Sequence, residues 1–338
     1  ILAPQDFARL IGRLRELFPF AGDAEIAVEI DPRTLEPAMI AALAEAGVNR
    51  VSLGIQDVSE EVQALVNRIQ PIESVALAVD RLRRAGIGRI NVDLMYGLPA
   101  QTVRHVEASV SAVLALRPDR AAVFGYAHVP WFAKHQQAID ASLLPGAAER
   151  MRQAEAAAHA FAAAGWEAVG FDHYARPDDE LALAAREGRL HRNFQGYTTD
   201  DAPVLLGLGA SAIGSLPGLY VQNEPHLGRW AEMIDAGHLS VVRGIAVGSE
   251  DLVRRAAINA LMTDFAVDVA EVAFEHDESP SLLADGLERL ADLAADGLCR
   301  IEGTRVTVPE EARLFVRNVA ARFDAHWAPS AARHSRAV

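Results

Sequence analysis

Two β-rich runs, NRVSLGIQD at residues 49–57 and RINVDLMYGLP at residues 89–99, decide the fold of this chain. Between them lies a segment with apolar residues at helical spacing, which ends at Gly86. Two strands joined by a helix form a right-handed βαβ unit, in which both strands run parallel in one sheet. The two runs therefore predict the centre of a parallel sheet.

The same alternation continues on both sides of this unit. A strand is predicted at residues 25–33, between a helical pattern at 4–18 and a second one that ends at Gly47. A helix at 103–116 and a strand at 121–130 follow. Polar residues end each strand, and no glycine-rich turn follows the first strand, which favours a partial parallel (β/α) barrel over a flat doubly wound sheet. In a barrel the carboxyl ends of the strands form one rim, where functional groups collect.

The rest of the chain predicts two further regions behind this α/β domain of residues 1–130. Residues 131–246 combine an alanine-rich helix with long polar segments, and we expect them to extend the barrel and supply substrate-site loops. Residues 247–338 contain helical patterns and the run CRIEGTRVTV at 299–308, which suits a β-hairpin. We expect a mainly helical, winged-helix-like C-terminal domain in which this hairpin is the wing.

The composition excludes several classes of function. The 338 residues include 32 basic and 46 acidic side chains, for a net charge of −14, and such a chain is a poor binder of nucleic acid or of a membrane surface. No apolar run approaches the roughly 18 residues that a membrane span requires. The single cysteine, Cys299, can form no intrachain disulfide, and we therefore expect a cytoplasmic protein.

Polar side chains stand where three of the predicted strands end. Glu29 and Asp31 belong to the first strand, Gln56 to the second and Asp93 to the third. Carboxylates accept charge-assisted hydrogen bonds from amines and hydroxyls, and the guanidinium of Arg68 can donate two parallel hydrogen bonds to a carboxylate. A ligand with a ribose, an amine and a carboxylate would match this set. The alternative for each acid alone is to cap the helix that follows it.

The histidines allow a different hypothesis. His128, His173 and His191 could combine with Asp93 into a hydrolytic metal site on the rim. No paired spacing such as His-x-His supports this site, so we expect no metal ligands in the chain.

Three further segments are candidates for binding a ligand or substrate. LLGLGASAIG, residues 205–214, contains a Gly-x-Gly that suits either close packing or a backbone approach to a nucleotide. GFDHYARPDDELA at 170–182 and HRNFQGYTT at 191–199 are either surface loops or, because they place cations beside aromatic rings, a site for a large flat polyanion. The candidate substrate-binding residues are Arg176, His191, Arg192 and Gln195.

Taken in order, these segments resemble the oxygen-independent coproporphyrinogen III oxidase family of radical S-adenosylmethionine (SAM) enzymes. EIDPR, GIQD, LVNR, VDLMYGLP and the AH of GYAH recur across the wider superfamily, whereas GFDHYARPDDELA and HRNFQGYTT are specific to the oxidases. The resemblance covers nearly the whole chain. It implies a partial parallel barrel followed by a mainly helical C-terminal domain.

The resemblance also implies cofactors and the residues that bind them. Glu29 and Ile213 would contact the SAM molecule that is bound to a [4Fe–4S] cluster. A second SAM site would be lined by Gln56, Arg68, Asp93 and Ala127. No catalytic residue is assigned.

The chemistry implied by the resemblance is oxidative decarboxylation. Reductive cleavage of SAM gives methionine and a 5′-deoxyadenosyl radical, which removes a hydrogen atom from the β-carbon of a substrate propionate. Loss of carbon dioxide and of one further electron leaves a vinyl group. Two propionates react in this way, which converts coproporphyrinogen III into protoporphyrinogen IX in heme biosynthesis. The implied partners are coproporphyrinogen III, an electron donor and an electron acceptor, and we expect a monomer.

The sequence departs from the family at its start. The C-x3-C-x2-C motif that holds the cluster is absent, and so is the GGTPT strand end expected before Ile1. One thiol, Cys299 in the predicted hairpin, cannot replace three. We therefore expect a fragment that lacks the cysteine segment and the first barrel strands, and that has no turnover alone. Two other functions stay open, a porphyrin or heme carrier of the same superfamily and a metal-dependent barrel hydrolase.

Overall fold

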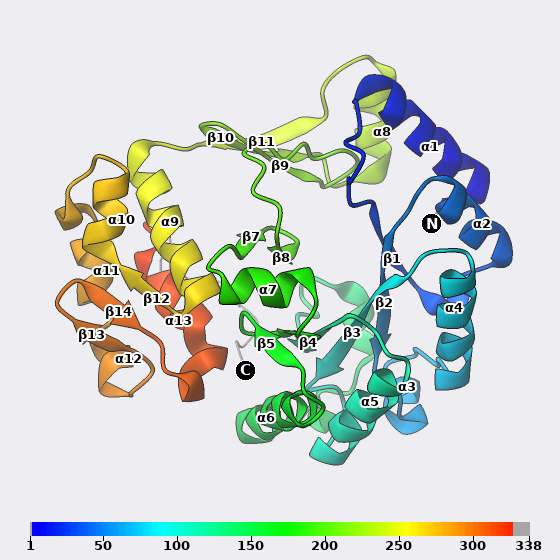
Figure 1. Cartoon of the computed structure of the whole chain (residues 1–338), viewed down its shortest axis with the longest axis horizontal. Helices are drawn as coiled ribbons and strands as arrows, with labels where there is room; N and C mark the ends of the chain where they lie inside the picture. Colours follow the sequence, from blue (N-terminus) through cyan, green and yellow to red (C-terminus); the bar gives the residue numbers. More distant parts are fainter. Residues whose placement is uncertain (1, 327–338) are drawn as a thin grey trace. The chain divides into compact units, whose positions relative to one another are not determined.

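The computed structural model describes residues 2–326, which divide into two units, residues 2–182 and 183–326 (Figure 1). The division falls inside the predicted middle region, 131–246, and the finer three-part division stays a prediction. Ile1 and residues 327–338, the end of the predicted C-terminal domain, lie outside the described part.

The first unit is built on a six-stranded sheet in the order β1-β2-β3-β4-β6-β5. Strands β1 to β4 are parallel, whereas β6 runs antiparallel to both β4 and β5. The parallel strands lie where the sequence predicted them and confirm the βαβ units. The strands are β1 (Ala27–Ile30), β2 (Arg50–Gln56), β3 (Arg89–Tyr96), β4 (Arg120–Gly125), β5 (Glu167–Val169) and β6 (His173–Ala175).

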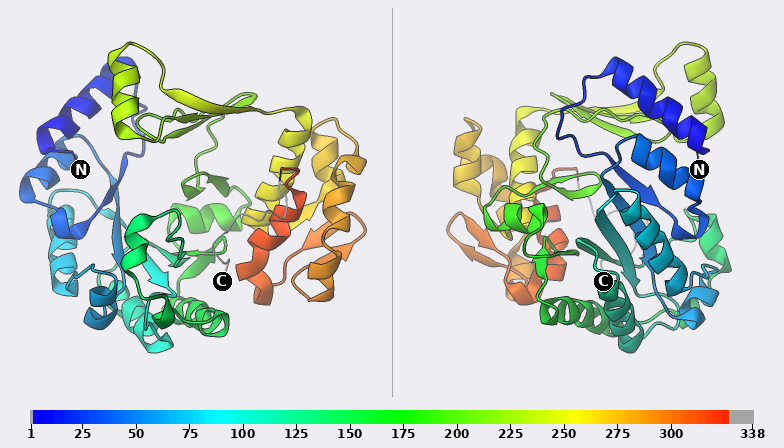
Figure 2. Two further views of the ribbon diagram at one scale, coloured as in Figure 1. Left: turned by 180° about the vertical axis from the view of Figure 1, so that it is seen from behind. Right: turned by 45° about the vertical axis from the view of Figure 1, so that its right-hand side comes forward.

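Helices cover one face of this sheet, along which α2, α4 and α5 lie (Figures 1 and 2). On α4 the apolar residues at helical spacing are buried, among them Val75, Val79 and Leu82, because this stripe faces the strands. The helices of this unit are α1 (Pro4–Leu17), α2 (Pro37–Glu45), α3 (Glu60–Leu65), α4 (Ile72–Arg84), α5 (Val103–Ala115) and α6 (Ala147–Ala163).

The two faces of the sheet differ in polarity. In β3, Ile90, Val92 and Leu94 are buried, whereas Asn91 and Asp93 between them are only partly buried, because successive side chains of a strand point to opposite faces. The apolar face packs under the helices. The polar face is therefore the one available for a site.

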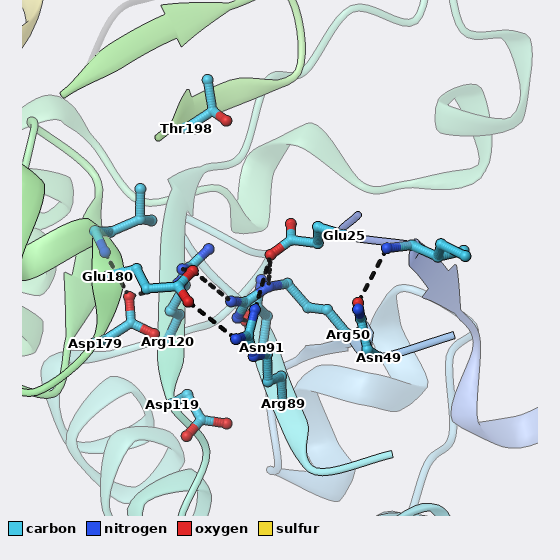
Figure 3. A network of polar contacts seen from close by, with 12 residues as sticks. Glu25, Asn49, Arg50, Arg89, Asn91, Asp119, Arg120, Asp179, Glu180 and Thr198 are labelled. Carbon is cyan, nitrogen blue, oxygen red and sulfur yellow. Dashed lines mark hydrogen bonds and ion pairs between the residues drawn. The ribbon is translucent and has the colours of Figure 1, made fainter. Parts of the chain in front are cut away.

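Charged side chains connect the amino ends of the parallel strands (Figure 3). The first residues of β2, β3 and β4 are Arg50, Arg89 and Arg120, and their acidic partners are Glu25, Asp179 and Glu180. Arg50 Nε donates to Glu25 Oε2 over 2.8 Å, and Arg89 Nη2 lies 3.0 Å from Glu180 Oε1. These pairs lie at the end of the strands opposite the carboxyl rim, where residues of barrel folds contribute stability rather than chemistry.

The first strands of the second unit are antiparallel. β7 (His191–Asn193) and β8 (Gly196–Thr198) form a hairpin. A separate three-stranded sheet has the order β11-β10-β9, and helix α8 follows its middle strand in the chain. Its elements are β9 (Ile213–Leu216), β10 (Leu219–Asn223), α8 (Leu227–Asp235) and β11 (Val241–Ala246). Helix α7 (Glu180–Arg186) crosses the boundary between the units.

The C-terminal region is mainly helical, as predicted, and contains the predicted hairpin. β13 and β14 pair antiparallel and join β12 in a small sheet. Two short helices, α11 and α12, are separated by a turn at residues 289–290. The elements are α9 (Ser249–Asp264), β12 (Ala266–Asp268), α10 (Val269–Glu275), α11 (Ala284–Glu288), α12 (Ala291–Ala295), β13 (Arg300–Glu302), β14 (Arg305–Thr307) and α13 (Val316–Ala320). No helix within residues 2–326 has the length and hydropathy to cross a bilayer.

Candidate cofactor and substrate sites

The structure brings Glu29 and Asp93 together on the polar face of the sheet. Glu29 pairs with Ser52 in the register of β1 and β2, and Ser52 Oγ donates a hydrogen bond to Asp93 Oδ2 over 3.1 Å. The negative charge of Glu29 acts on Asp93 across this link. Two of the predicted site acids therefore share one face, and Ser52 connects them.

Burial raises the pKa of Asp93 from 3.8 to about 6. The hydrogen bond from Ser52 and the positive charge of His173 oppose this rise, whereas the charge of Glu29 adds to it. A carboxylate that has lost its hydration is stabilised by any ligand that brings a cation or several hydroxyl donors. Asp93 is therefore suited to binding a cationic or hydroxylated ligand.

Arg68 lies beside the carboxyl end of β2. Its Nη2 donates to the carbonyl of Gly54 over 2.7 Å, and its Nη1 lies 3.4 Å from Asp31 Oδ2. Asp31 is also bound by Arg33 through two side-chain nitrogens and the backbone amide. The side-chain hydrogen bond from Arg33 is the main cause that lowers the pKa of Asp31 to about 2. Asp31 thus caps the short turn that follows β1, the alternative role foreseen for these acids, and also holds Arg68.

Three side chains around Gly54 each have a buried polar atom without a hydrogen-bond partner among the described residues: Gln56 Oε1, Arg68 Nε and Gln70 Oε1. Gln56 has a left-handed φ of 71° at a register shift between β2 and β3. A Cβ at position 54 would lie 2.9 Å from Gln56 Nε2 and 3.3 Å from Arg68 Nη2. Buried polar groups in native proteins are nearly always paired, so this bulge with its orphaned atoms indicates room for a polar ligand.

Ala127 follows β4 and is exposed. The side chain of Gln136 fixes its loop, because Nε2 donates to Ala127 O over 3.1 Å and Oε1 accepts from Val129 N over 2.6 Å. Next to Ala127, the hydroxyl of Tyr126 lies 3.2 Å from His128 Nδ1. Ala127 therefore presents a small side chain at the same carboxyl end of the sheet as Gln56.

Ile213 lies in the second unit, at the start of β9. The glycine-containing segment before it packs tightly, since a Cβ on Gly207 would lie 2.6 Å from the backbone of Ile213. The Asn223 side-chain amide donates to the carbonyls of Gly207 and Gly209 over 3.1 and 2.9 Å. The described residues therefore show close packing, which is one of the two predicted roles of the Gly-x-Gly.

The candidate substrate residues lie in two places. Arg176 follows β6, binds Asp178 through two nitrogens, and donates its backbone N–H to the Asp119 carbonyl. Asp119 precedes β4, so Arg176 lies at the amino end of the sheet, and the structure does not bring it together with Asp93. The other three candidates, His191, Arg192 and Gln195, belong to the β7–β8 hairpin of the second unit.

The β7–β8 hairpin has a well-fixed turn. Asn193 Oδ1 accepts from the backbone amides of Gln195 and Gly196, and the Arg192 guanidinium lies 5.2 Å from the ring centre of Tyr197. The Tyr197 hydroxyl donates to the carbonyl of Met262 over 2.8 Å. One anchored hairpin therefore presents a histidine, an arginine and a glutamine.

Comparison with known proteins supports the resemblance. Residues 2–113 match the radical SAM superfamily and residues 248–315 match the HemN C-terminal domain. Over all 338 residues, the chain is 48% identical to the oxygen-independent coproporphyrinogen III oxidase of Bradyrhizobium diazoefficiens, of which it covers 75%. The chain belongs to the oxygen-independent coproporphyrinogen III oxidase family.

Other members agree with this placement. The relative from Paracoccus denitrificans is 41% identical, with 100% of this chain and 74% of that protein covered. The solved structure of coproporphyrinogen III oxidase (HemN) from Escherichia coli, described as a radical SAM enzyme, superimposes with a TM-score of 0.91 at 38% identity, over 96% of this chain and 75% of that one. Membership confirms the predicted α/β radical SAM fold with its C-terminal domain, and it implies SAM and a [4Fe–4S] cluster as cofactors.

The residues of this chain do not fit the cluster of the oxidase family. Three thiolates are needed, and the chain contains one cysteine. Cys299 is 2% exposed in the second unit, and burial raises the pKa of its thiol, which disfavours the thiolate form. The cluster ligands of a functional family member would therefore have to come from outside these 338 residues.

The metal-site hypothesis finds no support in residues 2–326. No group of three or more His, Cys, Asp and Glu side chains in this part of the chain is placed to hold a metal ion. His128 lies next to Tyr126, His173 is bound to Asp172, and His191 belongs to the second unit.

Sequence reasoning missed Ser52, and it named His173 only as a possible metal ligand, without its pairing to Asp172. Ser52 could have been found, because it is the polar residue that alternates with Val51 and Leu53 in a predicted strand. His173 lies in a strand of only three residues, and so short a run carries no readable periodicity. The segment at 170–182 is not a surface loop as one reading had it, since Tyr174 is buried and stacks on Phe161 at 4.6 Å.

Proposed function

We propose that this chain supplies the SAM-binding sheet and substrate-binding residues of an enzyme that converts coproporphyrinogen III into protoporphyrinogen IX in heme biosynthesis. The observation that carries the proposal is the group of buried polar atoms around Gly54, where Gln56 Oε1 and Arg68 Nε have no hydrogen-bond partner among the described residues and the perturbed acid Asp93 lies opposite on the next strand. Buried polar atoms without hydrogen bonds lower the free energy of unfolding, and a bound polar ligand that forms those hydrogen bonds would remove this penalty.

Two SAM sites are part of this proposal. In the second one, the Arg68 guanidinium suits the SAM carboxylate, Asp93 suits its ammonium group or ribose hydroxyls, and the Gln56 amide completes the hydrogen bonds. Ala127 leaves space at the carboxyl end of β4. Glu29 stays a predicted contact of the first SAM. When bound and reductively cleaved, SAM supplies the radical that removes hydrogen from a propionate side chain.

The proposed substrate matches the charge of the β7–β8 hairpin. Coproporphyrinogen III carries four carboxylates on a large ring, and Arg192 with its neighbours His191 and Gln195 can bind a carboxylate with charge assistance. Arg176 stays a predicted substrate contact on the first unit. An electron donor, an electron acceptor, a cytoplasmic location and a monomeric state complete the proposal.

The decisive experiment supplies three thiolates for the cluster. A C-x3-C-x2-C segment from the coproporphyrinogen oxidase family is joined ahead of Ile1, the cluster is reconstituted anaerobically, and SAM, reductant and coproporphyrinogen III are added. We expect 5′-deoxyadenosine and protoporphyrinogen IX from the joined protein and neither from the 338-residue chain.

Other outcomes would replace the proposal. Absence of both products from a joined protein that holds its cluster would refute the oxidase function. Tight heme binding without turnover would instead identify a carrier, and stoichiometric zinc in the purified chain would favour a hydrolase.

A further inference from the structure

A row of residues crosses the sheet from β3 to β6 and ends at His173. In the strand register Asp93 pairs with Ala122, and Ala122 pairs with His173. Residues that are paired across neighbouring strands point to the same face of a sheet. Asp93 and His173 therefore face the same side, and one residue, Ala122, stands between them in the row.

The His173 ring is held in place from two sides. Its Nδ1 lies 2.6 Å from Asp172 Oδ1, and the two side chains are 17% and 11% exposed. Phe124 meets the ring edge to face, with 5.9 Å between the ring centres. A carboxylate on one imidazole nitrogen fixes the tautomer and the orientation of the ring, so that the other nitrogen points in a defined direction.

The groups that surround Asp93 come from each neighbouring strand. β1 contributes the negative charge of Glu29, β2 the hydroxyl of Ser52, β4 the uncharged Ala122, and β6 the imidazole of His173. His173 is the only one of these four that can be a cation. It therefore offsets both the burial of the carboxylate and the repulsion from Glu29.

We propose that His173, oriented by Asp172, is a positioning residue that keeps Asp93 ionised so that Asp93 can bind the ammonium or ribose group of SAM. The inference rests on the proposed second SAM site. It assigns a role to the first half of GFDHYARPDDELA, which the reaction chemistry had not used. His173 acts through Asp93, and no contact of His173 with the ligand is needed.

The test follows the titration of Asp93 and, separately, the binding of SAM. The 338-residue chain is labelled with ¹³C at aspartate carboxyls, and the Asp93 signal is identified by its loss in Asp93→Asn. In His173→Gln we expect the titration midpoint of Asp93 to move to higher pH. SAM affinity, measured by calorimetry, should fall about threefold at pH 6.5 and be unchanged at pH 8.5, where the carboxylate is ionised in either protein.

Three further variants keep the test decisive. His173→Lys restores a cation and should recover binding at pH 6.5, which a purely structural role would not predict. Asp172→Asn should also move the titration midpoint of Asp93 to higher pH, but by less than His173→Gln does. His159→Gln, on an exposed position of α6, should change neither quantity.

The two proposals fail in distinguishable ways. An unchanged Asp93 midpoint in His173→Gln would overturn the role of His173, even if SAM binds. If no protein binds SAM, the second SAM site is wrong, and the Asp93 midpoint still decides whether His173 controls this acid.

Discussion

Arg120 and Asp179 form a buried ion pair at the amino end of the sheet, with 2.7 Å between Nε and Oδ1 and side chains only 8% and 7% exposed (Figure 3). Asp179 belongs to the oxidase-specific segment at 170–182, whose other end reaches the carboxyl side of β4, where the Val123 amide donates to the Asp172 carbonyl over 2.8 Å. The segment therefore crosses the sheet. One end carries the pair with Arg120, and the other carries the Asp172–His173 pair.

Removing one partner of this buried pair should destabilise the first unit. Asp179→Asn leaves the Arg120 charge buried, and such a loss typically costs about 3 kcal/mol. Asp179 also accepts from the Leu181 amide over 2.8 Å at the start of α7, which adds to the loss. Urea unfolding followed by circular dichroism measures the change.

The matched control for this prediction is Asp178→Asn in the same segment. Asp178 pairs with Arg176 at 2.9 Å, but its side chain is 69% exposed, so the change should be below about 1 kcal/mol. Equal effects of the two substitutions would show that burial of the pair with Arg120 is unimportant.

Gly54→Ala should impair ligand binding with little effect on the fold. The added methyl group would lie 2.9 Å from Gln56 Nε2 and 3.3 Å from Arg68 Nη2, so both side chains must move. We expect SAM affinity to fall by about tenfold, equivalent to about 1.4 kcal/mol, in calorimetric titration.

Gly88→Ala provides the comparison, because nothing lies within 4 Å of a Cβ there. The variant should bind SAM as the unaltered chain does. Normal SAM binding by Gly54→Ala would mean that Gln56 and Arg68 do not form the site.

The grouping of several candidate residues on one face of the sheet was predictable from the sequence, because parallel strands are regular. Glu29 and Gln56 stand at or near the carboxyl ends of strands with clear apolar patterns, and such ends meet at one edge. Asp93 was also expected at a strand end but lies within β3, on the same face of the sheet. Arg68 was less obvious, because its approach to Gly54 depends on the turn after α3. Local patterns predict which end of a strand carries function, whereas contacts between elements depend on the packed structure.

The segments that carry the oxidase signature show the limit of sequence reasoning. Arg176 and His173 are three residues apart, yet Arg176 lies at the amino end of the sheet and His173 in the row of Asp93. Because β6 runs antiparallel to β4, the segment passes from one end of the sheet to the other within a few residues. The direction of so short a strand is set by its neighbours, which the sequence does not reveal.

Burial of Asp93 should make the folded protein less stable at neutral pH than it is with a neutral side chain. Because the pKa is raised to about 6 in the folded state, the protonated carboxyl favours folding below 3.8, and this contribution is lost as the pH rises to about 6. The difference of roughly two pH units corresponds to about 3 kcal/mol.

Asp93→Asn should therefore raise the free energy of unfolding at pH 7 by up to about 3 kcal/mol and change it little at pH 3.5, while abolishing SAM binding. Asp80→Asn, on the exposed side of α4, should show no such pH dependence. If Asp93→Asn lowers stability at pH 7, the carboxylate is structural and not a destabilised functional group.

The last prediction concerns the β7–β8 hairpin and the substrate. Arg192→Ala removes a guanidinium that lies over Tyr197, at a distance of 5.2 Å from the ring centre, and leaves the Asn193 turn and the hydrogen bond from Tyr197 to Met262 intact. If Arg192 binds a propionate, affinity for the stable analogue coproporphyrin III should fall about tenfold in fluorescence titration, with SAM affinity unchanged. Arg192→Lys keeps the positive charge but loses the two parallel N–H donors of the guanidinium, so its affinity for coproporphyrin III should lie between those of the unaltered chain and Arg192→Ala.

The control is Arg243→Ala, on exposed β11, which should bind coproporphyrin III normally. Equal losses of affinity in Arg192→Ala and Arg243→Ala would indicate nonspecific attraction of the polyanion instead of a site on the hairpin.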